Sequence, residues 1–264
     1  MSFFNKILSK IGVGSASVET ELFNEVFIPG EEVRGRVTVK GGAVEQHIEN
    51  IYFKVKSTYE DEIEFENSEG EEEEINLTRT ALIREFQVSE SFSINASETV
   101  KFDLEFTLPI FVPVTVGKTK TWVETGLDIK SAVDPADKDY IHVQPHPLMD
   151  AVIGSAMDMG LEVYKVVCEP APRNMNMMVP FVQEFSLRPV EGHFRGRLEE
   201  IELIFRPMSS GFMVFMEIDR KLKGVSGRLA KMMGTDETMV RFPVNYDNLD
   251  GLTLRLIELI ERHC

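Results

Sequence analysis

Residues 27–40 read F-I-P-G-E-E-V-R-G-R-V-T-V-K, and they reveal the architecture more clearly than any other segment. Pro29-Gly30 is a turn signal, after which small or apolar residues alternate with polar ones. The first set is Val33, Gly35, Val37 and Val39, and the second is Arg34, Arg36, Thr38 and Lys40. A period of two is typical of a half-buried β-strand. A second run, Ile51–Lys56, repeats the pattern after Gly41-Gly42, so we predict a fold built from sheets.

Short strand-like segments continue along most of the chain, with turn residues between them. Before residue 145 the predicted strands are Ser17–Phe23, Val33–Lys40, Ile48–Tyr59, Ile75–Val88, Glu98–Thr107, Lys118–Leu127 and Tyr140–Val143. After it they are Leu161–Cys168, Phe181–Leu187, Arg195–Phe205 and Phe212–Asp219. Strands at this spacing predict a β-sandwich, and the second group predicts another one in tandem.

Two prolines in the polar segment His142–Pro147 resist both helix and sheet, and they mark the predicted domain boundary. Pro147 suits the first position of a helix over Leu148–Met159, which Gly160 would end. Another short helix is expected over Val225–Met233 and a longer one over Leu249–His263. We therefore predict a mainly β protein with an amphipathic helix at 1–12, domains at 15–143 and 148–264, and a C-terminal helix.

The charge of the chain argues against nucleic-acid binding. The net charge is −16, and ten acidic residues lie in the single stretch Glu60–Glu74. Phosphate contacts need a basic face, which such a chain does not offer in general. Calcium loops space their ligands around a glycine, whereas Glu71–Glu74 are consecutive, so we interpret the stretch as a solvated hairpin with its tip at 67–70.

The sequence holds no motif for catalysis or for a cofactor. It has no G-x-S-x-G elbow, no H-E-x-x-H helix and no Walker loop. Pro145 keeps His142 and His146 from sharing a helical face, so a linker is favoured over a zinc site. Cys168 lies among apolar residues and is interpreted as a core thiol rather than a nucleophile. We expect a protein that is not an enzyme and needs neither metal nor cofactor.

Localisation follows from what the termini and cysteines suggest. No apolar run approaches the roughly 20 residues of a membrane span. The start has no secretory cleavage pattern, and two cysteines make no disulfide framework. We expect a cytoplasmic protein, with peripheral contact at the inner face of the membrane as an additional location.

Two segments are candidate binding sites. The N-terminal helix has an apolar face that would contact an anionic membrane or a second copy of the chain; its residues are Phe3, Phe4, Ile7, Leu8 and Ile11. A basic stretch in the second domain would hold an anion, an acidic partner or the chain's own acidic block; its residues are Arg220, Lys221, Lys223, Arg228 and Lys231. Each segment also has an interpretation without binding: the N-terminal helix could pack against the domain, and the basic stretch could be a solvated face. The methionine-rich segment Asn174–Met178 is a further candidate for a binding edge.

Several phrases, in order and nearly end to end, resemble the bacterial sporulation-control (SpoOM) family. They are Met1-Ser2-Phe3-Phe4, Pro29-Gly30-Glu31-Glu32-Val33, Lys40-Gly41-Gly42, Val44-Glu45-Gln46, Gly126-Leu127-Asp128-Ile129 and Asp134-Pro135-Ala136-Asp137. The Pro-Gly-Glu turn also resembles one in arrestins, and the family is similar to arrestins in fold. No motif here matches the phosphate-sensing latch of arrestins.

The resemblance implies two tandem arrestin-like β-sandwich domains, no enzymatic activity and a regulatory role such as control of sporulation initiation. We expect an adaptor that contacts protein partners of unknown identity, with homodimerisation and membrane contact as further options and no nucleic-acid partner. The alternative is a β-sandwich that binds a small ligand or a lipid at the membrane surface. A pocket lined by apolar residues with few polar groups would favour that alternative.

Overall fold

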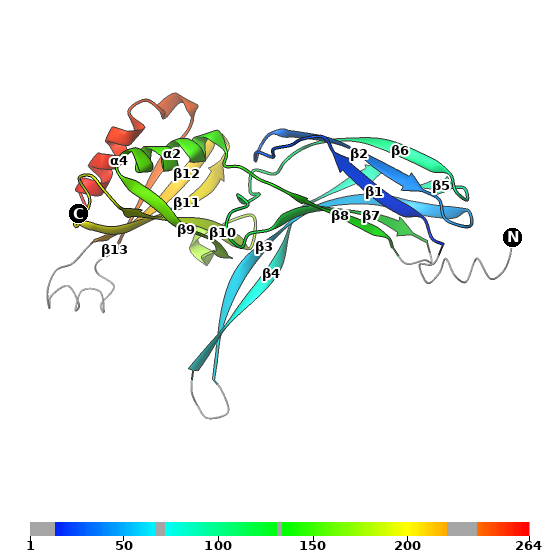
Figure 1. Cartoon of the computed structure of the whole chain (residues 1–264), viewed down its shortest axis with the longest axis horizontal. Coiled ribbons are helices and arrows are strands. Elements are labelled where there is room, and N and C mark those ends of the chain that lie inside the picture. Colours follow the sequence, from blue (N-terminus) through cyan, green and yellow to red (C-terminus); the bar gives the residue numbers. More distant parts are fainter. Residues whose placement is uncertain (1–13, 67–71, 131–133, 221–236, 264) are drawn as a thin grey trace. The chain divides into compact units, whose positions relative to one another are not determined.

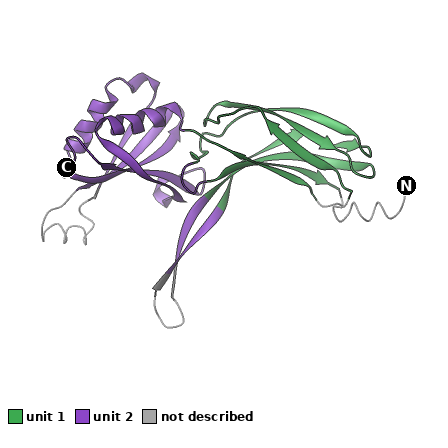
Figure 2. Cartoon of the chain, in the orientation of Figure 1, with its two compact units in different colours: residues 1–58, 80–115, 120–144 green, residues 59–79, 116–119, 145–264 purple. Residues whose placement is uncertain are grey.

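The computed structural model of the chain describes residues 14–66, 72–130, 134–220 and 237–263. The chain divides into two compact units (Figure 2). Unit 1 comprises residues 1–58, 80–115 and 120–144, and unit 2 comprises residues 59–79, 116–119 and 145–264. The longest strand, β3 at Gln46–Glu66, begins in unit 1 and continues into unit 2. The strand that follows it, β4 at Glu72–Ser89, begins in unit 2 and returns to unit 1, because residues 59–79 group with the second unit.

Unit 1 is built from two antiparallel sheets (Figure 1). One has the order β1-β2-β6, with β1 at Ser17–Leu22, β2 at Glu32–Lys40 and β6 at Thr99–Thr107. The other has the order β4-β3-β7-β8, with β5 paired to β3. Its strands are β3 at Gln46–Glu66, β4 at Glu72–Ser89, β5 at Phe92–Ile94, β7 at Thr121–Ile129 and β8 at Ala136–Ile141.

The alternating segment after Pro29-Gly30 forms β2, the middle strand of the first sheet. In β2 the residues Val33, Gly35, Val37 and Val39 are buried, as predicted, and the intervening residues are not. Gly30 adopts a positive φ of 88°, which other residues rarely tolerate, and its amide donates to the carbonyl of Leu108 at 2.8 Å. The turn thereby joins the start of β2 to the end of β6, and register is fixed from there along both strands.

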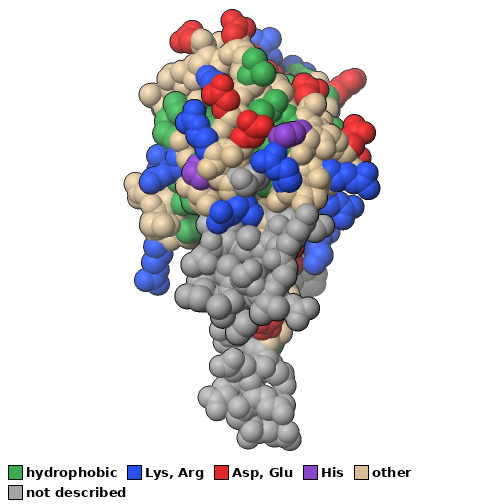
Figure 3. All heavy atoms as spheres, turned by 90° about the vertical axis from the view of Figure 1, so that its left-hand side faces the viewer, with side chains coloured by type: hydrophobic (Ala, Val, Ile, Leu, Met, Phe, Trp, Pro, Cys, Tyr) green, Lys and Arg blue, Asp and Glu red, His purple; other side chains and the backbone are tan. Residues whose placement is uncertain are grey.

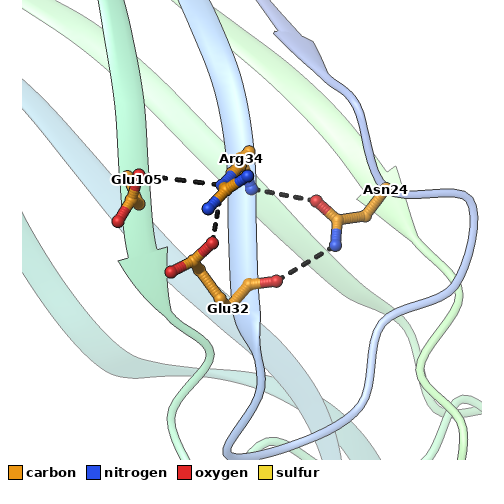
Figure 4. A network of polar contacts seen from close by, with 4 residues as sticks. All are labelled: Asn24, Glu32, Arg34 and Glu105. Carbon is orange, nitrogen blue, oxygen red and sulfur yellow. Dashed lines mark hydrogen bonds and ion pairs between the residues drawn. The ribbon is translucent and has the colours of Figure 1, made fainter.

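A polar network holds the entry to β2 in place (Figure 4). The Asn24 side chain accepts a hydrogen bond from the Arg34 amide at 2.9 Å and donates one to the Glu32 carbonyl at 3.1 Å. The Arg34 guanidinium lies 2.6 Å from the Glu32 carboxylate and 3.7 Å from that of Glu105 on β6. These side chains are largely exposed, so their contribution is to alignment more than to stability.

The two sheets of unit 1 enclose an apolar core. Phe53 of β3 is fully buried, and its ring meets that of Phe106 on β6 edge to face, with centroids 4.8 Å apart. Ile51 and Val55 on the same face of β3 are also fully buried, opposite Val37 of β2. Each such side chain contributes about 1.5–3 kcal/mol by leaving water. This core is what the alternation in the sequence encodes.

The described residues of unit 2 include a five-stranded antiparallel sheet of order β13-β12-β11-β10-β9. The strands are β9 at Leu161–Pro170, β10 at Phe181–Pro189, β11 at Leu198–Met208, β12 at Gly211–Arg220 and β13 at Glu237–Val244. The helices are α2 at Pro147–Asp158 and α4 at Leu252–Glu261, with short 3₁₀ turns η1 at Arg173–Met175 and η2 at Tyr246–Asn248. The helices α2 and α4 contact each other, and α2 contacts β9 and β12 (Figure 1).

Local sequence explains how α2 begins and ends. His146 precedes it and accepts a hydrogen bond from the Leu148 amide at 3.1 Å, while Pro147 takes the first helical position. Gly160 follows the helix with a φ of 87°. Buried Leu148 and Val152 belong to the apolar face that α2 directs into the unit.

The mainly β fold class, the helix after Pro147 and the C-terminal helix are confirmed by the strands and helices observed. Among the described residues of unit 2, α2 packs on β9 and β12 of the five-stranded sheet, and α4 packs on α2. The expected strands missed β5 and β13. The predicted N-terminal helix at 1–12 and the short helix over Val225–Met233 lie outside the described residues.

Candidate functional site

Most of the binding residues predicted from sequence lie outside the described part of the chain. This is the case for the apolar set Phe3, Phe4, Ile7, Leu8 and Ile11 and for the bases Lys221, Lys223, Arg228 and Lys231. Arg220 is described: it is the last residue of β12, is partly buried and lies opposite Leu198 of β11. Both candidate segments therefore remain predictions.

The candidate binding site in the described structure is the outer part of the β3–β4 hairpin, which we call the arm and define as residues 59–66 and 72–79. β7 follows β3 only as far as Ser57, which lies opposite Thr121. β4 lies at the end of its sheet, with β3 as its neighbour. Among the described residues the arm is thus a two-stranded ribbon, visible in Figure 1 as the paired ends of β3 and β4. Such ribbons are marginally stable on their own.

Two side-chain contacts show how the faces of the arm are arranged. The Thr78 hydroxyl donates to the Glu60 carboxylate at 2.9 Å, and the Arg79 guanidinium pairs with the Asp61 carboxylate. Even-numbered residues of the two strands therefore share one face, and odd-numbered residues share the other.

The two faces differ sharply in chemistry. The odd-numbered face carries Ile63, Ile75 and Leu77, whose side chains are 36%, 45% and 40% exposed. The even-numbered face carries Glu62 and Glu74, both exposed. An apolar face on one side of a hairpin normally packs against another layer, and here the described residues supply none beyond the root of the arm.

The root of the arm is anchored within unit 2. The Tyr59 ring stacks on that of buried Phe181 in β10, with centroids 5.8 Å apart and planes inclined by 21°. The Lys118 ammonium lies 3.5 Å from the Glu60 carboxylate on the opposite face. These contacts fix where the arm starts, and its exposed apolar residues lie farther along the ribbon.

Sequence reasoning placed an acidic hairpin here and missed its apolar face. The signal was present, because Tyr59 and Ile63 alternate with glutamates, with Asp61 between them, and Ile75 and Leu77 alternate with polar residues on the returning strand. The abundance of glutamate dominated the interpretation. The predicted tip at 67–70 lies outside the described residues.

A second surface is the face of the unit 2 sheet that does not carry Phe185, Phe205 and Phe212. Here Met175 of η1 packs on Val182, Ile204 and Phe215. The guanidinium of Arg206 donates to the Met175 carbonyl at 3.3 Å. Of the methionine segment, Met175 is thus part of a small core, whereas Met178 is 77% exposed.

Acidic and basic groups share the surface of unit 2, and acidic, basic and apolar side chains all reach the face shown in Figure 3. On β10, burial raises the pKa of the Glu184 carboxyl to about 7, with nearby Glu169 and Glu202 adding to the shift. The Glu200 carboxylate accepts a hydrogen bond from the Tyr164 hydroxyl, and this bond raises the pKa of Tyr164 to about 12. The pKa values of Glu184 and Tyr164 are thus set by burial and by neighbouring side chains of the same sheet.

A polar seam lies along the β1–β8 side of unit 1. The Thr20 hydroxyl donates to that of Thr125 at 2.7 Å, and the Thr20 amide donates to the Asp137 carboxylate at 2.7 Å. Beside them, burial raises the pKa of the Asp139 carboxyl to about 6, with the Asp137 and Glu19 carboxylates adding to the shift. One Asp139 oxygen has no hydrogen-bond partner among the described residues.

Cys168, His142 and His146 each have structural contacts. Burial raises the pKa of the Cys168 thiol to about 12, although the Thr119 hydroxyl 3.4 Å away opposes the shift. A thiol with that pKa stays protonated near neutral pH and is a poor nucleophile. His146 caps α2, and the His142 ring lies 3.0 Å from the Thr115 hydroxyl.

The described residues form neither a metal-binding cluster nor a membrane-spanning helix. Within those residues no group of three His, Cys, Asp or Glu side chains is arranged to hold a metal ion. No helix formed by them has the length and apolar character needed to span a membrane.

Comparison with known proteins gives a consistent answer along the chain. A family model described as SpoOM protein matches residues 4–222. The sporulation-control protein spo0M of Bacillus subtilis (strain 168) is 36% identical over 261 residues, which are 99% of this chain and 97% of that protein. The crystal structure of Spo0M, sporulation control protein, from Bacillus subtilis superposes with a TM-score of 0.75 at 32% identity. It covers 96% of this chain and 100% of that one.

Proposed function

This chain belongs to the SpoOM family, and from that premise we propose that it is a cytoplasmic, non-enzymatic regulatory protein that acts by binding other proteins. The name of its Bacillus subtilis relative, a sporulation-control protein, indicates the process: control of entry into sporulation or of a related developmental step. In this proposal the chain is an arrestin-like adaptor whose surfaces, rather than a catalytic centre, carry its activity.

The observation that carries the proposal is the arm. It exposes Ile63, Ile75 and Leu77 on one face of a ribbon whose outer strand, β4, has no further neighbour in the described residues. Exposed apolar residues on an unpaired strand edge are a liability unless a partner covers them. A protein partner that covers these apolar residues would explain why the chain exposes them.

The condition of the nucleophilic residues supports a role without catalysis. The Cys168 thiol is buried and its pKa is raised to about 12, which removes the thiolate that a reaction would need. His146 is occupied in capping a helix, where its Nδ1 accepts the Leu148 amide. Binding, by contrast, needs only the exposed surface that the arm provides.

The test is quantitative co-purification from the source cells. Tagged full-length chain is compared with the double variant Ile75→Thr, Leu77→Thr, which keeps strand-forming residues but removes the apolar face. Leu82→Thr serves as the control, because Leu82 lies on the same strand, outside the arm, and is 49% exposed. We expect the same proteins to be recovered with the parent and the control, and about tenfold less of them with the double variant.

Two results would contradict the proposal. One is that no protein is enriched with the parent chain over a tag-only sample. The other is a lipid or small molecule that is recovered in stoichiometric amount while no protein is, which would favour the ligand-binding alternative.

A further inference from the structure

We infer that the outer edge of β4 in the arm binds an extended partner segment in which basic and apolar residues alternate. The inference rests on the proposed function, since it assumes that the arm binds proteins, and it adds the chemistry of the partner. The binding mode is strand addition, in which main-chain hydrogen bonds join the partner to the sheet and alternate side chains give specificity.

The first step concerns which edge is open. β3 and β4 pair with each other, so each uses one side of its backbone within the arm. The outer side of β3 is approached at the root, where the Thr58 amide donates to the Lys120 carbonyl at 2.9 Å and Lys118 pairs with Glu60. β4 has no neighbour on its outer side among the described strands. Its amides and carbonyls there are free to pair with an added strand.

The second step concerns the apolar face. An added strand continues the pleat, so every second side chain of the partner would lie beside Ile75 and Leu77. Those two side chains are 45% and 40% exposed, and Ile63 across the ribbon extends the same surface. Apolar partner side chains at these positions would cover that surface and gain the hydrophobic term.

The third step concerns the acidic face. The remaining partner side chains would lie on the even-numbered face, beside Glu74 and within reach of Glu62. Within the described part of the chain no cation pairs with either carboxylate, whereas Lys118 and Arg79 already pair with Glu60 and Asp61. Lysine or arginine at alternate partner positions would neutralise Glu62 and Glu74.

Charge also decides between a foreign partner and a second copy of the arm. The stretch Glu60–Glu74 carries ten acidic residues, and the whole chain has a net charge of −16. Two arms pairing edge to edge would bring these like charges together, which opposes association. The occupant is therefore a cationic segment of another protein.

The experiment measures binding of synthetic peptides to the full-length chain by titration calorimetry. The probe is a peptide of alternating lysine and valine. One control has the same composition with all lysines before all valines, and the other alternates glutamate and valine. We expect the probe to bind at least about tenfold more tightly than either control, with an affinity that falls as salt is raised.

Variants separate the two faces. Ile75→Thr with Leu77→Thr should weaken the probe about tenfold while Leu82→Thr leaves it unchanged. Glu62→Gln with Glu74→Gln should weaken it about threefold to tenfold and flatten the dependence on salt. Hydrogen exchange on the parent chain should show new protection at alternate amides of residues 74–79 when the probe is added, which is the signature of a paired edge.

Each contrary result has a distinct meaning. Equal binding of the probe and the block-ordered control would show charge attraction without strand pairing and would overturn the inference. Absence of probe binding, or protection away from β4, would also overturn it, while the co-purification result would still stand for or against the proposed function. Light scattering that shows a dimer lost in the Ile75→Thr, Leu77→Thr variant would replace the foreign segment with a second copy.

Discussion

The inner and outer halves of β3 have the same alternating pattern but opposite surroundings. In the inner half Ile51, Phe53 and Val55 are fully buried, with β7 alongside and the β2 sheet across the core. In the outer half Ile63 continues the alternation and is 36% exposed, with β4 as the partner strand. Periodicity thus indicates which face of a strand is apolar. That face contributes to stability only where a second layer packs against it.

The largest expected difference between the halves is in local opening. Amides of Ile51–Val55 should exchange with solvent only when unit 1 unfolds, because strands flank them on both sides. Amides of residues 74–79 belong to a two-stranded ribbon and should exchange through local opening. We expect the free energies of opening to differ by about 5 kcal/mol or more. Hydrogen exchange read by mass spectrometry measures this, and equal protection in the two segments would refute the contrast.

The next largest effect comes from truncating one core residue and one arm residue. Phe53→Ala should lower the free energy of unfolding by about 3–5 kcal/mol, because the ring packs on Phe106 and Phe86 and leaves a cavity. Ile63→Ala should change it by less than about 0.5 kcal/mol, as is usual at exposed positions. Denaturant unfolding of the full-length chain supplies both values. A loss of several kcal/mol at Ile63 would mean that the arm face is covered after all.

The fold was largely predictable where local signals agree. The alternation in β2, the turn at Pro29-Gly30 and the helix between Pro147 and Gly160 were all recognised, since each depends on neighbouring residues. β13 was missed; it contains Pro243, which is unusual inside a strand, but an edge strand tolerates proline and β13 ends the described sheet. β5 is too short, at three residues, for periodicity to register.

Features that depend on layers were not predictable in the same way. The sequence predicted helices in the second unit but not that α2 would pack on β9 and β12 of the described five-stranded sheet. The sequence also indicated the acidic charge of the arm but not the exposure of Ile75 and Leu77, because exposure depends on what packs against that face. The candidate site was therefore found from the structure, although its alternation was already legible.

Burial also shifts the pKa values of titratable groups, and Asp139 provides a test of this whose expected effect on stability is intermediate in size. Burial raises its pKa from 3.8 to about 6 in the folded chain. Between those values the unfolded chain loses the proton first, so this group lowers the stability progressively as pH rises from about 4 to 6. Above pH 6 the full penalty is present, and below about pH 4 there is none.

Replacing Asp139 by asparagine should remove that penalty. Near neutral pH Asp139→Asn should be more stable than the parent by about 1 kcal/mol, because partial exposure of the group reduces the full value of two pKa units. The new amide can donate to the neighbouring Asp137 carboxylate. Unfolding curves at several pH values measure the effect, and an advantage of the variant that stays constant down to about pH 4 would show that burial of the charge is not its cause.

The smallest effect distinguishes ion pairs of the covered sheet from those of the arm. Lys56 and Glu124, on β3 and β7, are 2.7 Å apart, and their side chains are only 22% and 24% exposed. Arg79 and Asp61 pair across the arm, where their side chains are 45% and 22% exposed. Partial burial weakens screening by water and salt, so the coupling of the first pair should reach about 0.5–1 kcal/mol and that of the second less than about 0.3 kcal/mol.

Double-mutant cycles measure both couplings, with Lys56→Met and Glu124→Gln for the first pair and Arg79→Met and Asp61→Asn for the second. The ordering matters more than the values, because each pair joins β3 to a neighbouring strand, β7 for the first and β4 for the second, and the pairs differ in whether further strands shield them. Added salt should reduce the arm coupling to nothing and leave part of the other. If the coupling of the arm pair proved the stronger, shielding by neighbouring strands would not explain the difference between the two halves of β3. The arm would then be a stably ordered element that needs no partner to cover it.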